Sequence, residues 1–389
     1  MNDISSLIWV KKYLNSRDDT SFFEVRNWKN YALVNRRDPN IAGYHLSDGS
    51  FDCANEMKTV YEYIERIVCK DTSHADITMC GEGDKGVLSF EQLGFGWTGL
   101  EFRSLGKKNR YVGGISLRTG EKFFIPTVAA YYFDNDFTEW SDFAGNSNGN
   151  ALGDTQEDAI DRGLAEFIER DKFVKYWYLQ NGELLRVAPE LFNSKLKGKI
   201  KYFYRKGYQV DFFTIHNQPE TIYTIWCLFR SVDRKNKLFS FTGLGADCDF
   251  EKAAEKAFDE ASATVFFHMS KESLLYMKER NTVLTEENPL QEGVVYYFSY
   301  DREKEFERLF EQVDQINAIP QMGCGRETLR EKALNYYRDI IYVPIQNKLL
   351  EELGMYEVKV FGIGGNNMYF TSREEILKKG KITGPCPLA

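Results

Sequence analysis

The stretch that decides the fold begins with Ala144-Gly-Asn-Ser-Asn-Gly-Asn-Ala-Leu-Gly153 and runs directly into a predicted helix over residues 154–179. Its glycines and asparagines predict a loop. Asp154, with Glu157 three residues later, has the spacing of a capping box at the start of that helix. A glycine-rich turn before a helix presents backbone N–H groups that can bind an anion. The stretch is neither a Walker loop nor a dinucleotide fingerprint, because the spacing of its glycines fits neither.

The predicted helix carries an acidic motif that occurs twice in the chain. Glu62-Tyr-Ile-Glu65-Arg66 recurs as Glu166-Phe-Ile-Glu169-Arg170. On a helix, the two glutamates of each copy project from one face, and each arginine lies one turn after the first glutamate. One interpretation is an exposed salt bridge worth about 0.3–0.5 kcal/mol.

The apolar flanks of both copies favour a second interpretation. Bulky residues between the glutamates indicate that these turns are partly buried, and buried carboxylates repel one another unless cations lie between them. Carboxylate oxygens suit Mg²⁺, which proteins usually share with substrate phosphates. A further segment, Phe241–Asp249, precedes an alanine-rich helix that carries Asp259 and Glu260, although an ordinary strand–turn–helix would look the same.

Predicted strands and helices are mixed along the whole chain. Strands are predicted over residues 111–117, 122–132, 208–215, 221–230, 238–243, 293–300 and 356–363, and helices over residues 51–69, 154–179, 250–277, 301–315 and 371–379. Paired strands between long helices indicate sheets covered by helices, in an α/β or α+β body. We predict an N-terminal lobe over residues 1–140 and a main body over residues 141–389, or one continuous domain.

Composition excludes several classes of protein. The 389 residues are 15% aromatic and carry a formal charge of −8, which excludes a disordered chain and a nucleic-acid partner held by phosphate neutralisation. The seven cysteines never form a Cys-x-x-Cys pair, which argues against a structural zinc site and a disulfide framework. The chain contains no apolar run long enough for a membrane helix, and its N-terminus lacks a secretion signal. We therefore expect a cytoplasmic protein.

Taken together, these segments resemble the YcaO family. Residues 147–171 are similar to its signature block, residues 62–66 to its first block, and residues 243–260 to its next block. The C-terminus, Gly384-Pro-Cys-Pro-Leu-Ala389, resembles the Pro-x-Pro-x-Pro tail of azoline-forming members, with Ala389 in place of the last proline. The fold that the resemblance implies is α+β, with mixed, largely antiparallel sheets covered by helices and with internal pseudo-repeats.

The resemblance also implies an ATP- and Mg²⁺-dependent cyclodehydratase of the microcin-synthetase type. Such an enzyme cyclises Cys, Ser or Thr of a ribosomally made precursor peptide to thiazoline or oxazoline, as in azole-modified bacteriocins. The implied metal ligands are Glu62, Glu65, Glu166 and Glu169. The implied nucleotide-binding residues are Asp154, Asp158, Arg66, Arg170 and Glu260. The implied catalytic residues belong to the tail, which would enter the active site, and they are Pro385, Pro387 and Ala389.

Departures from the family pattern leave alternatives open. Asp154 and Asp158 stand where the family has Asn and Glu, and Ala263 stands where a glutamine is expected. Alternatives are a YcaO-type enzyme that makes thioamides or amidines, and a noncatalytic nucleotide-binding scaffold in a peptide-modifying complex. Paired carboxylates of a glycosidase would explain two glutamates but not four with two arginines. Expected partners are the precursor peptide, an E1-like, ThiF-related leader-binding protein and an FMN-dependent dehydrogenase.

Overall fold

The computed structural model describes most of the chain. It describes residues 20–25, 30–35, 42–45, 53–131, 140, 143, 145–218, 220, 222–232, 234, 238–269, 296–311, 313–319, 328–371, 376, 378–380 and 386–388. The chain divides into two compact units. Unit 1 comprises Met1–Asp171 and Thr328–Tyr369, and unit 2 comprises Lys172–Glu327 and Phe370–Ala389. The sequence predicts a boundary between an N-terminal lobe and a main body at residues 140 and 141. The division into compact units does not test that boundary, which stays a prediction.

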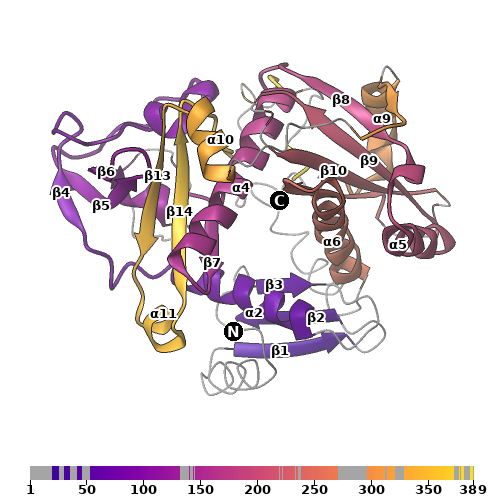
Figure 1. Cartoon of the computed structure of the whole chain (residues 1–389), viewed down its shortest axis with the longest axis horizontal. Coiled ribbons are helices and arrows are strands. Elements are labelled where there is room, and N and C mark those ends of the chain that lie inside the picture. Colours follow the sequence, from indigo (N-terminus) through magenta and orange to yellow (C-terminus); the bar gives the residue numbers. More distant parts are fainter. Residues whose placement is uncertain are drawn as a thin grey trace. The chain divides into compact units, whose positions relative to one another are not determined.

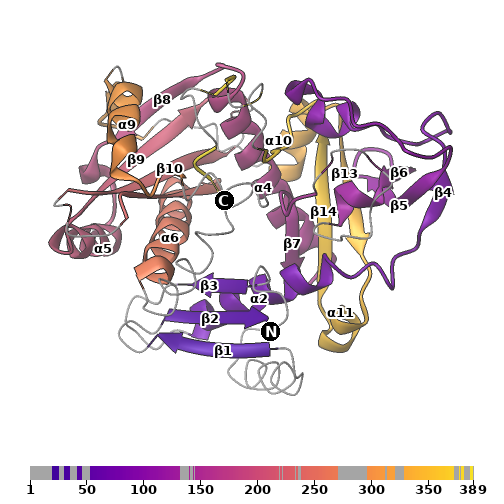
Figure 2. The ribbon, with the colours of Figure 1, turned by 180° about the vertical axis from the view of Figure 1, so that it is seen from behind.

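The main sheet of unit 1 is built from segments far apart in the sequence (Figures 1 and 2). Its strand order is β4-β5-β13-β14-β7, with β6 paired to β5, and every pairing is antiparallel. The strands are β4 (Thr78–Cys80), β5 (Asn109–Ser116), β6 (Lys122–Pro126), β7 (Asn150–Gly153), β13 (Asp339–Ile345) and β14 (Tyr356–Ile363). Strand β14 therefore joins the sequence-distant β7 to the sheet, which places the acidic helix that follows β7 beside the C-terminal strands.

Helix α4 (Gln156–Trp177) packs closely on β14 because glycines lie at the contact. A Cβ atom on Gly163 would lie 2.7 Å from the carbonyl oxygen of Gly149 and 2.9 Å from a methyl group of Val360. Gly149 itself has φ +78°, a conformation that other residues rarely adopt. The close packing of α4 on β14 therefore requires glycine at positions 149 and 163.

The rest of unit 1 consists of a smaller sheet and short helices. Strands β1 (Thr20–Val25), β2 (Asn30–Asn35) and β3 (Ala42–His45) form an antiparallel sheet. Helix α2 (Cys53–Val68), which carries the first acidic motif, contacts β2, β3 and β7. The short helices are η1 (Glu91–Phe95), η2 (Gly96–Thr98), α3 (Thr127–Ala130), α10 (Leu329–Tyr336) and α11 (Lys348–Leu353).

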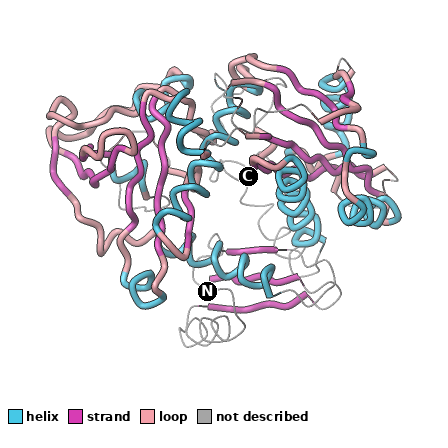
Figure 3. The backbone as a smooth tube through the Cα atoms, viewed as in Figure 1, coloured by secondary structure: helices cyan, strands magenta, loops and turns pink. Residues whose placement is uncertain are grey.

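Unit 2 contains a five-stranded sheet (Figure 3). The residues of its central strands are buried almost throughout. The strand order is β11 (Ser240–Asp247), β10 (Tyr223–Ser231), β9 (Tyr208–His216), β8 (Glu183–Val187) and β12 (Gln315–Ile316), and the β8–β12 pair alone is parallel among these strands. Neighbouring strand residues point to opposite faces. Phe212 accordingly stacks on Phe258, whereas Phe213 stacks on Phe310. This double burial explains why β9 and β10 are almost continuously apolar.

Three α-helices and two 3₁₀ turns in the described part of unit 2 accompany this sheet. Helix α5 (Ser194–Arg205) contacts β9, and helix α6 (Phe250–Met269) contacts β10 and β11. Helix α9 (Glu303–Phe310) follows the 3₁₀ turn η4 (Tyr300–Arg302), and another 3₁₀ turn, η3 (Pro189–Leu191), precedes α5. The predicted α+β class with largely antiparallel, helix-covered sheets is confirmed.

Several predicted elements differ from the structure. The strand predicted over 122–132 ends at Pro126, because proline lacks the N–H needed to continue a ladder, and helix α3 follows. The described part of the strand predicted over 293–300 forms turns and η4 instead. Helix α9 ends at Phe310, before the predicted residue 315. The helix predicted over 371–379 falls largely outside the described residues.

Two further structural findings concern the cysteines and membrane-spanning helices. Cys69, Cys80, Cys227, Cys248 and Cys386 are free thiols. Among the residues that the structure describes, no helix combines the length and apolarity needed to cross a lipid bilayer.

Candidate functional site

Unit 1 brings both acidic motifs together. Glu62 and Glu65 lie on α2, and Glu166 lies on α4. The charges of Glu62 and Glu166 both act on Glu65, together with that of Arg66. As its i, i+4 spacing predicts, Arg66 forms an ion pair with Glu62, at 3.7 Å. Three of the four glutamates expected to bind metal therefore share one electrostatic environment.

A fourth carboxylate at this place, Glu357, was not predicted. It lies on β14, is 2% exposed, and is the charged group that raises the pKa of Glu65 most, after burial itself. Burial raises the pKa of Glu357 to about 8. The sequence signal for it is two charges, Glu357 and Lys359, at alternate positions in a strand whose intervening residues are apolar. Glu357 lies in a strand and belongs to no repeated helical motif, so the repetition of glutamates gives no signal for it.

Polar side chains hold Glu357 in place. Its Oε1 atom accepts hydrogen bonds from the Cys69 thiol and from Asn150 Nδ2, at 2.5 and 3.4 Å. Lys359 is 1% exposed, and its Nζ donates to the carbonyl of Asn146 at 2.6 Å. Burial lowers the pKa of Lys359 to about 8, while the surrounding anionic groups oppose that shift. The other oxygen of Glu357, Oε2, is buried without a hydrogen-bond partner among the described residues.

Glu169 and Arg170 form an ion pair with each other on α4, just before Asp171, where unit 1 ends in this helix. The two side chains are 9% and 10% exposed and approach to 3.5 Å. The i, i+4 spacing of Glu166 and Arg170 also predicts that Arg170 holds Glu166 across one helical turn, and this stays a prediction. A buried pair of this kind neutralises its own charges, although one guanidinium nitrogen of Arg170, Nη1, has no hydrogen-bond partner among the described residues.

The start of α4 differs from the predicted capping box. Thr155, rather than Asp154, is the N-cap: its hydroxyl accepts from the backbone N–H of Asp158 at 3.1 Å. Asp154 instead accepts from the hydroxyl of Tyr61 on α2 at 2.8 Å. Asp158 forms an ion pair with Arg162 at 2.9 Å. Asp154 therefore ties α2 to the beginning of α4.

The asparagine-rich stretch before α4 is not the open loop that was predicted. Residues 150–153 form strand β7, and Asn146 and Asn148 are buried. Asn146 donates to the carbonyl of Met368 at 2.7 Å, and Asn148 hydrogen-bonds the side chain of Asn367. These asparagines satisfy the backbone and side chains of the C-terminal part of unit 1, because buried amides need hydrogen-bond partners.

The remaining predicted residues belong to unit 2. Glu260 on α6 accepts a hydrogen bond from the backbone N–H of Leu244 at 2.6 Å. It lines a small pocket together with Thr242, Tyr297 and Pro387. Pro387 and its neighbours Cys386 and Leu388 are buried. Pro385 and Ala389 lie outside the described residues.

The donor set in unit 1 fits a bound magnesium–nucleotide. Carboxylate oxygens are the ligands that Mg²⁺ prefers, and it usually takes one or two of them plus phosphate oxygens. The buried Oε2 of Glu357 and the like charges around Glu65 are features that a cation would stabilise. Within the described residues, no three His, Cys, Asp or Glu side chains form a ready-made metal site.

Comparisons with known proteins give a family and a fold. A family model described as YcaO cyclodehydratase, ATP- and Mg²⁺-binding, matches residues 52–361. No curated protein matches the chain. Among solved structures, a heterocyclase in complex with substrate and cofactor has a TM-score of 0.71 at 15% identity, over 98% of this chain and 55% of that chain. This chain thus spans about half the length of that heterocyclase.

Two other solved structures match over 90% or more of their length. YcaO from Methanopyrus kandleri, bound with AMPPCP and Mg²⁺, has a TM-score of 0.64 at 18% identity, over 92% of this chain and 90% of that chain. A chain of the E. coli microcin synthetase McbBCD complex with pro-MccB17 bound has a TM-score of 0.64 at 14% identity, over 95% of this chain and 100% of that chain. At these identities the likeness establishes the fold.

Proposed function

The chain belongs to the YcaO family, and on this premise we propose that it activates backbone amides of a ribosomally made precursor peptide and cyclises Cys, Ser or Thr to thiazoline or oxazoline. The family model describes ATP- and Mg²⁺-binding cyclodehydratases, which supports an ATP-dependent enzyme. The observation that carries the proposal is the convergence of Glu62, Glu65, Glu166 and Glu357 in unit 1.

The chemistry of the proposed reaction needs charge neutralisation more than covalent help from the protein. The side chain of Cys, Ser or Thr adds to the preceding carbonyl carbon, the resulting oxyanion takes the γ-phosphoryl group of ATP, and phosphate then leaves as the C=N bond forms. The peptide loses one water, whose oxygen departs with the phosphate. ATP supplies the phosphoryl group, and Mg²⁺ offsets the charge of its phosphates.

In this proposal the residues of the chain have distinct roles. Glu62, Glu65, Glu166 and Glu169 hold Mg²⁺. The buried carboxyl group of Glu357 acts electrostatically on Glu65. Arg66 and Arg170 contact phosphate, while Asp154, Asp158 and Glu260 bind nucleotide. The tail residues Pro385, Pro387 and Ala389 orient the reacting amide. The microcin synthetase complex with its bound pro-peptide, named for one neighbouring structure, supports proposing a precursor peptide and partner proteins. The resemblance to the family implies that these partners are an E1-like leader-binding protein and an FMN-dependent dehydrogenase.

Binding of a non-hydrolysable ATP analogue tests the carboxylate site. By calorimetry, the intact chain should bind β,γ-methylene-ATP only with Mg²⁺ present. Glu65→Gln and Glu166→Gln should each weaken binding by at least about tenfold, because each removes a charge-assisted contact worth roughly 1.5–3 kcal/mol. Glu352→Gln, on the exposed side of α11, is the matched control and should bind as the parent does. Equal affinity of all four proteins would contradict the proposed site.

The mass of the peptide product tests the reaction itself. With its partner proteins and precursor peptide, the enzyme should release phosphate and leave the peptide lighter by one water per event. Replacement of oxygen by sulfur would instead identify a thioamide-forming enzyme. An unchanged peptide mass in an intact complex would identify a scaffold subunit.

A further inference from the structure

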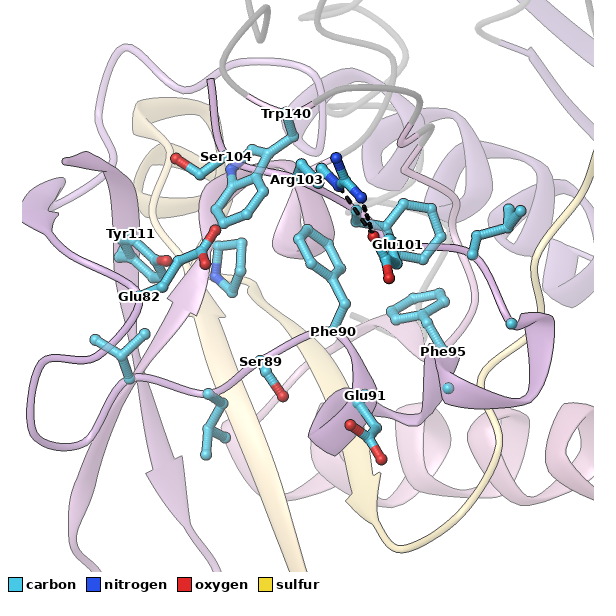
Figure 4. A pocket seen from close by; sticks show the side chains of 17 residues that line it. Glu82, Ser89, Phe90, Glu91, Phe95, Glu101, Arg103, Ser104, Tyr111 and Trp140 are labelled. Carbon is cyan, nitrogen blue, oxygen red and sulfur yellow. Dashed lines mark hydrogen bonds and ion pairs between the residues drawn. The ribbon is translucent and has the colours of Figure 1, made fainter. Parts of the chain in front are cut away.

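Unit 1 contains a pocket beside η1, and none of the residues assigned above to nucleotide, metal or the tail lines it (Figure 4). The rings of Phe90, Phe95 and Trp140 pack on one another at this pocket and are each at most 7% exposed. These rings are therefore closed to a ligand. The contacts of Cys386 in the C-terminal tail of unit 2 are buried as well, but they join the tail to the fold itself.

The thiol of Cys386 lies beside two buried tyrosines of unit 2. Tyr178, which directly follows α4, hydrogen-bonds the thiol with its hydroxyl group. Tyr297 interacts electrostatically with both of these groups. The side chains of Tyr178, Tyr297 and Cys386 are 5%, 2% and 4% exposed. Because a buried hydroxyl group needs a hydrogen-bond partner, the tail supplies one that Tyr178 requires.

The Tyr178 hydroxyl remains a donor over a wide range of pH. Burial raises its pKa well above 10, so the group keeps its proton at neutral and mildly alkaline pH. Sulfur is a weak hydrogen-bond acceptor, but this bond is shielded from water, where electrostatic attraction is stronger. A tail that leaves its place must break the bond, which therefore favours the docked position of Cys386.

A second contact holds the chain upstream of Cys386. Gln180 Nε2 donates to the carbonyl oxygen of Lys379 at 3.2 Å and to that of Trp177 at 3.3 Å. The backbone of Gln180 has φ +55°, in the left-handed region that residues other than glycine rarely adopt. The residues that follow α4 therefore contact the C-terminal segment at two places, residues 379 and 386.

The residues after Cys386 are also packed within unit 2. Pro387 lines the small pocket that contains Glu260 and Tyr297, and Leu388 is 1% exposed. The ring of proline fixes the φ angle of Pro387, so the position of Cys386 sets much of the direction in which the chain continues. A contact that fixes Cys386 therefore also fixes Pro387 beside Glu260.

From these contacts we infer that Tyr178 is a positioning residue, whose hydroxyl group fixes Cys386 and Pro387 in the place from which the tail orients the reacting amide. The inference rests on the function proposed above for the tail. Tyr178 itself contacts neither peptide nor nucleotide in this assignment. Loss of its hydroxyl group should therefore lower kcat and leave the affinity for nucleotide unchanged.

Alkylation of the cysteines in the intact chain tests this anchor without any peptide substrate. Iodoacetamide reaches a buried thiol only when the structure around it opens, so the rate at Cys386, measured by mass spectrometry, reports how often the tail leaves its place. Tyr178→Phe keeps the ring but lacks the hydroxyl group, and it should raise this rate roughly five- to tenfold. Tyr176→Phe is the matched control, because Tyr176 is equally buried but points to nearly the opposite side of the helix, and it should leave the rate unchanged.

Two other thiols in the same sample serve as references. Cys248 is exposed and should react fast in every variant. Cys227 is buried in strand β10 and reports on unfolding of unit 2 as a whole. A faster reaction at Cys386 with no change at Cys227 shows release of the tail alone. Equal rates at Cys386 in the parent and in Tyr178→Phe would overturn the inference, and so would equal increases at Cys386 and Cys227.

Turnover distinguishes a positioning role from packing of the tail alone. With precursor peptide and partner proteins, Tyr178→Phe and Cys386→Ala should each lower kcat roughly fivefold, with unchanged affinity for β,γ-methylene-ATP and Mg²⁺. The double variant should be no slower than either single variant, because all three lack the same contact. Cys386→Ser should keep most of the activity, because its hydroxyl group also accepts from Tyr178.

Full kcat in Tyr178→Phe, with its tail released, would overturn the positioning role. A parent protein that leaves the peptide unchanged would refute the proposed function and the positioning role with it. The alkylation rates need no turnover, so they still show in that case whether Tyr178 anchors the tail.

Discussion

At the scale of single residues, Glu357 shows how a buried carboxyl group reports on its surroundings. Its pKa is raised from 4.5 to about 8 by burial. Between these two pH values the folded chain holds a proton that the unfolded chain releases, so the free energy of unfolding falls as pH rises. Lys359, whose pKa is lowered to about 8 from 10.5, acts in the opposite sense but only above pH 8.

Glu357→Gln should therefore change the pH dependence of stability. Between pH 5 and pH 8 the parent protein should lose at least about 1 kcal/mol of unfolding free energy relative to the variant, because glutamine has no carboxyl group to ionise. Urea titrations at several pH values measure the difference. Glu352→Gln, on a partly exposed carboxylate of α11, should instead run parallel to the parent. Parallel curves for Glu357→Gln as well would show that Glu357 is ionised in the fold.

At the scale of elements, the junction between β7, α4 and β14 depends on backbone approach. Glycine in a helix interior costs about 1 kcal/mol relative to alanine, so Gly163 is unfavourable for α4 alone. It is retained because a Cβ there would lie 2.7 Å from a backbone oxygen, and backbone atoms cannot move aside as side chains can. Packing therefore outweighs helix propensity at this position.

Gly163→Ala should lower stability by about 1–3 kcal/mol in spite of the gain in propensity. Gly198→Ala provides the matched control, since Gly198 lies in helix α5, is exposed, and has open space where the Cβ would be. That control should raise stability by up to about 1 kcal/mol. Thermal unfolding of both variants measures the two effects. Stabilisation by both substitutions would show that α4 is not held at this distance from β14.

At the scale of the whole molecule, the C-terminal tail belongs to the packing of unit 2. Cys386 and Leu388 are 4% and 1% exposed, and Pro387 lines the pocket that contains Glu260. Removal of residues 385–389 should abolish turnover and spare ATP binding, as the proposed orienting role requires. It should also lower stability by roughly 2 kcal/mol, because it removes the buried Leu388 side chain from the packing of unit 2.

A C-terminal extension separates the two effects of that truncation. Two added glycines leave residues 386–388 in place but move the terminal carboxylate of Ala389. Unfolding temperature should then be unchanged, while turnover of the precursor peptide falls by at least about tenfold. Full turnover by the extended protein would argue against an orienting role for the chain terminus.

Repetition and periodicity in the sequence were enough to predict part of this molecule. The strand over 356–363 has the predicted bounds, and β5, β9, β10 and helices α2 and α4 lie close to theirs. The repeated Glu-x-x-Glu-Arg motif singled out Glu62, Glu65 and Glu166, because spacing along one helix fixes which residues share a face. The structure brings the charges of these three residues together. The family that this motif resembles is the family to which the chain belongs.

Other features follow from contacts between distant segments and had no local signal. Glu357 joins the carboxylates because antiparallel pairing of β14 with β7 carries it beside α2, and strand pairing over such a separation in sequence leaves no periodic trace. Asp154 contacts Tyr61 instead of capping its own helix, and the asparagines before it satisfy the C-terminal segment. Local spacing thus predicted the helices and their acidic faces, and the resemblance of the motifs predicted the family. Only tertiary packing decided which polar groups are buried together, because desolvation and charge repulsion arise only when separate segments meet.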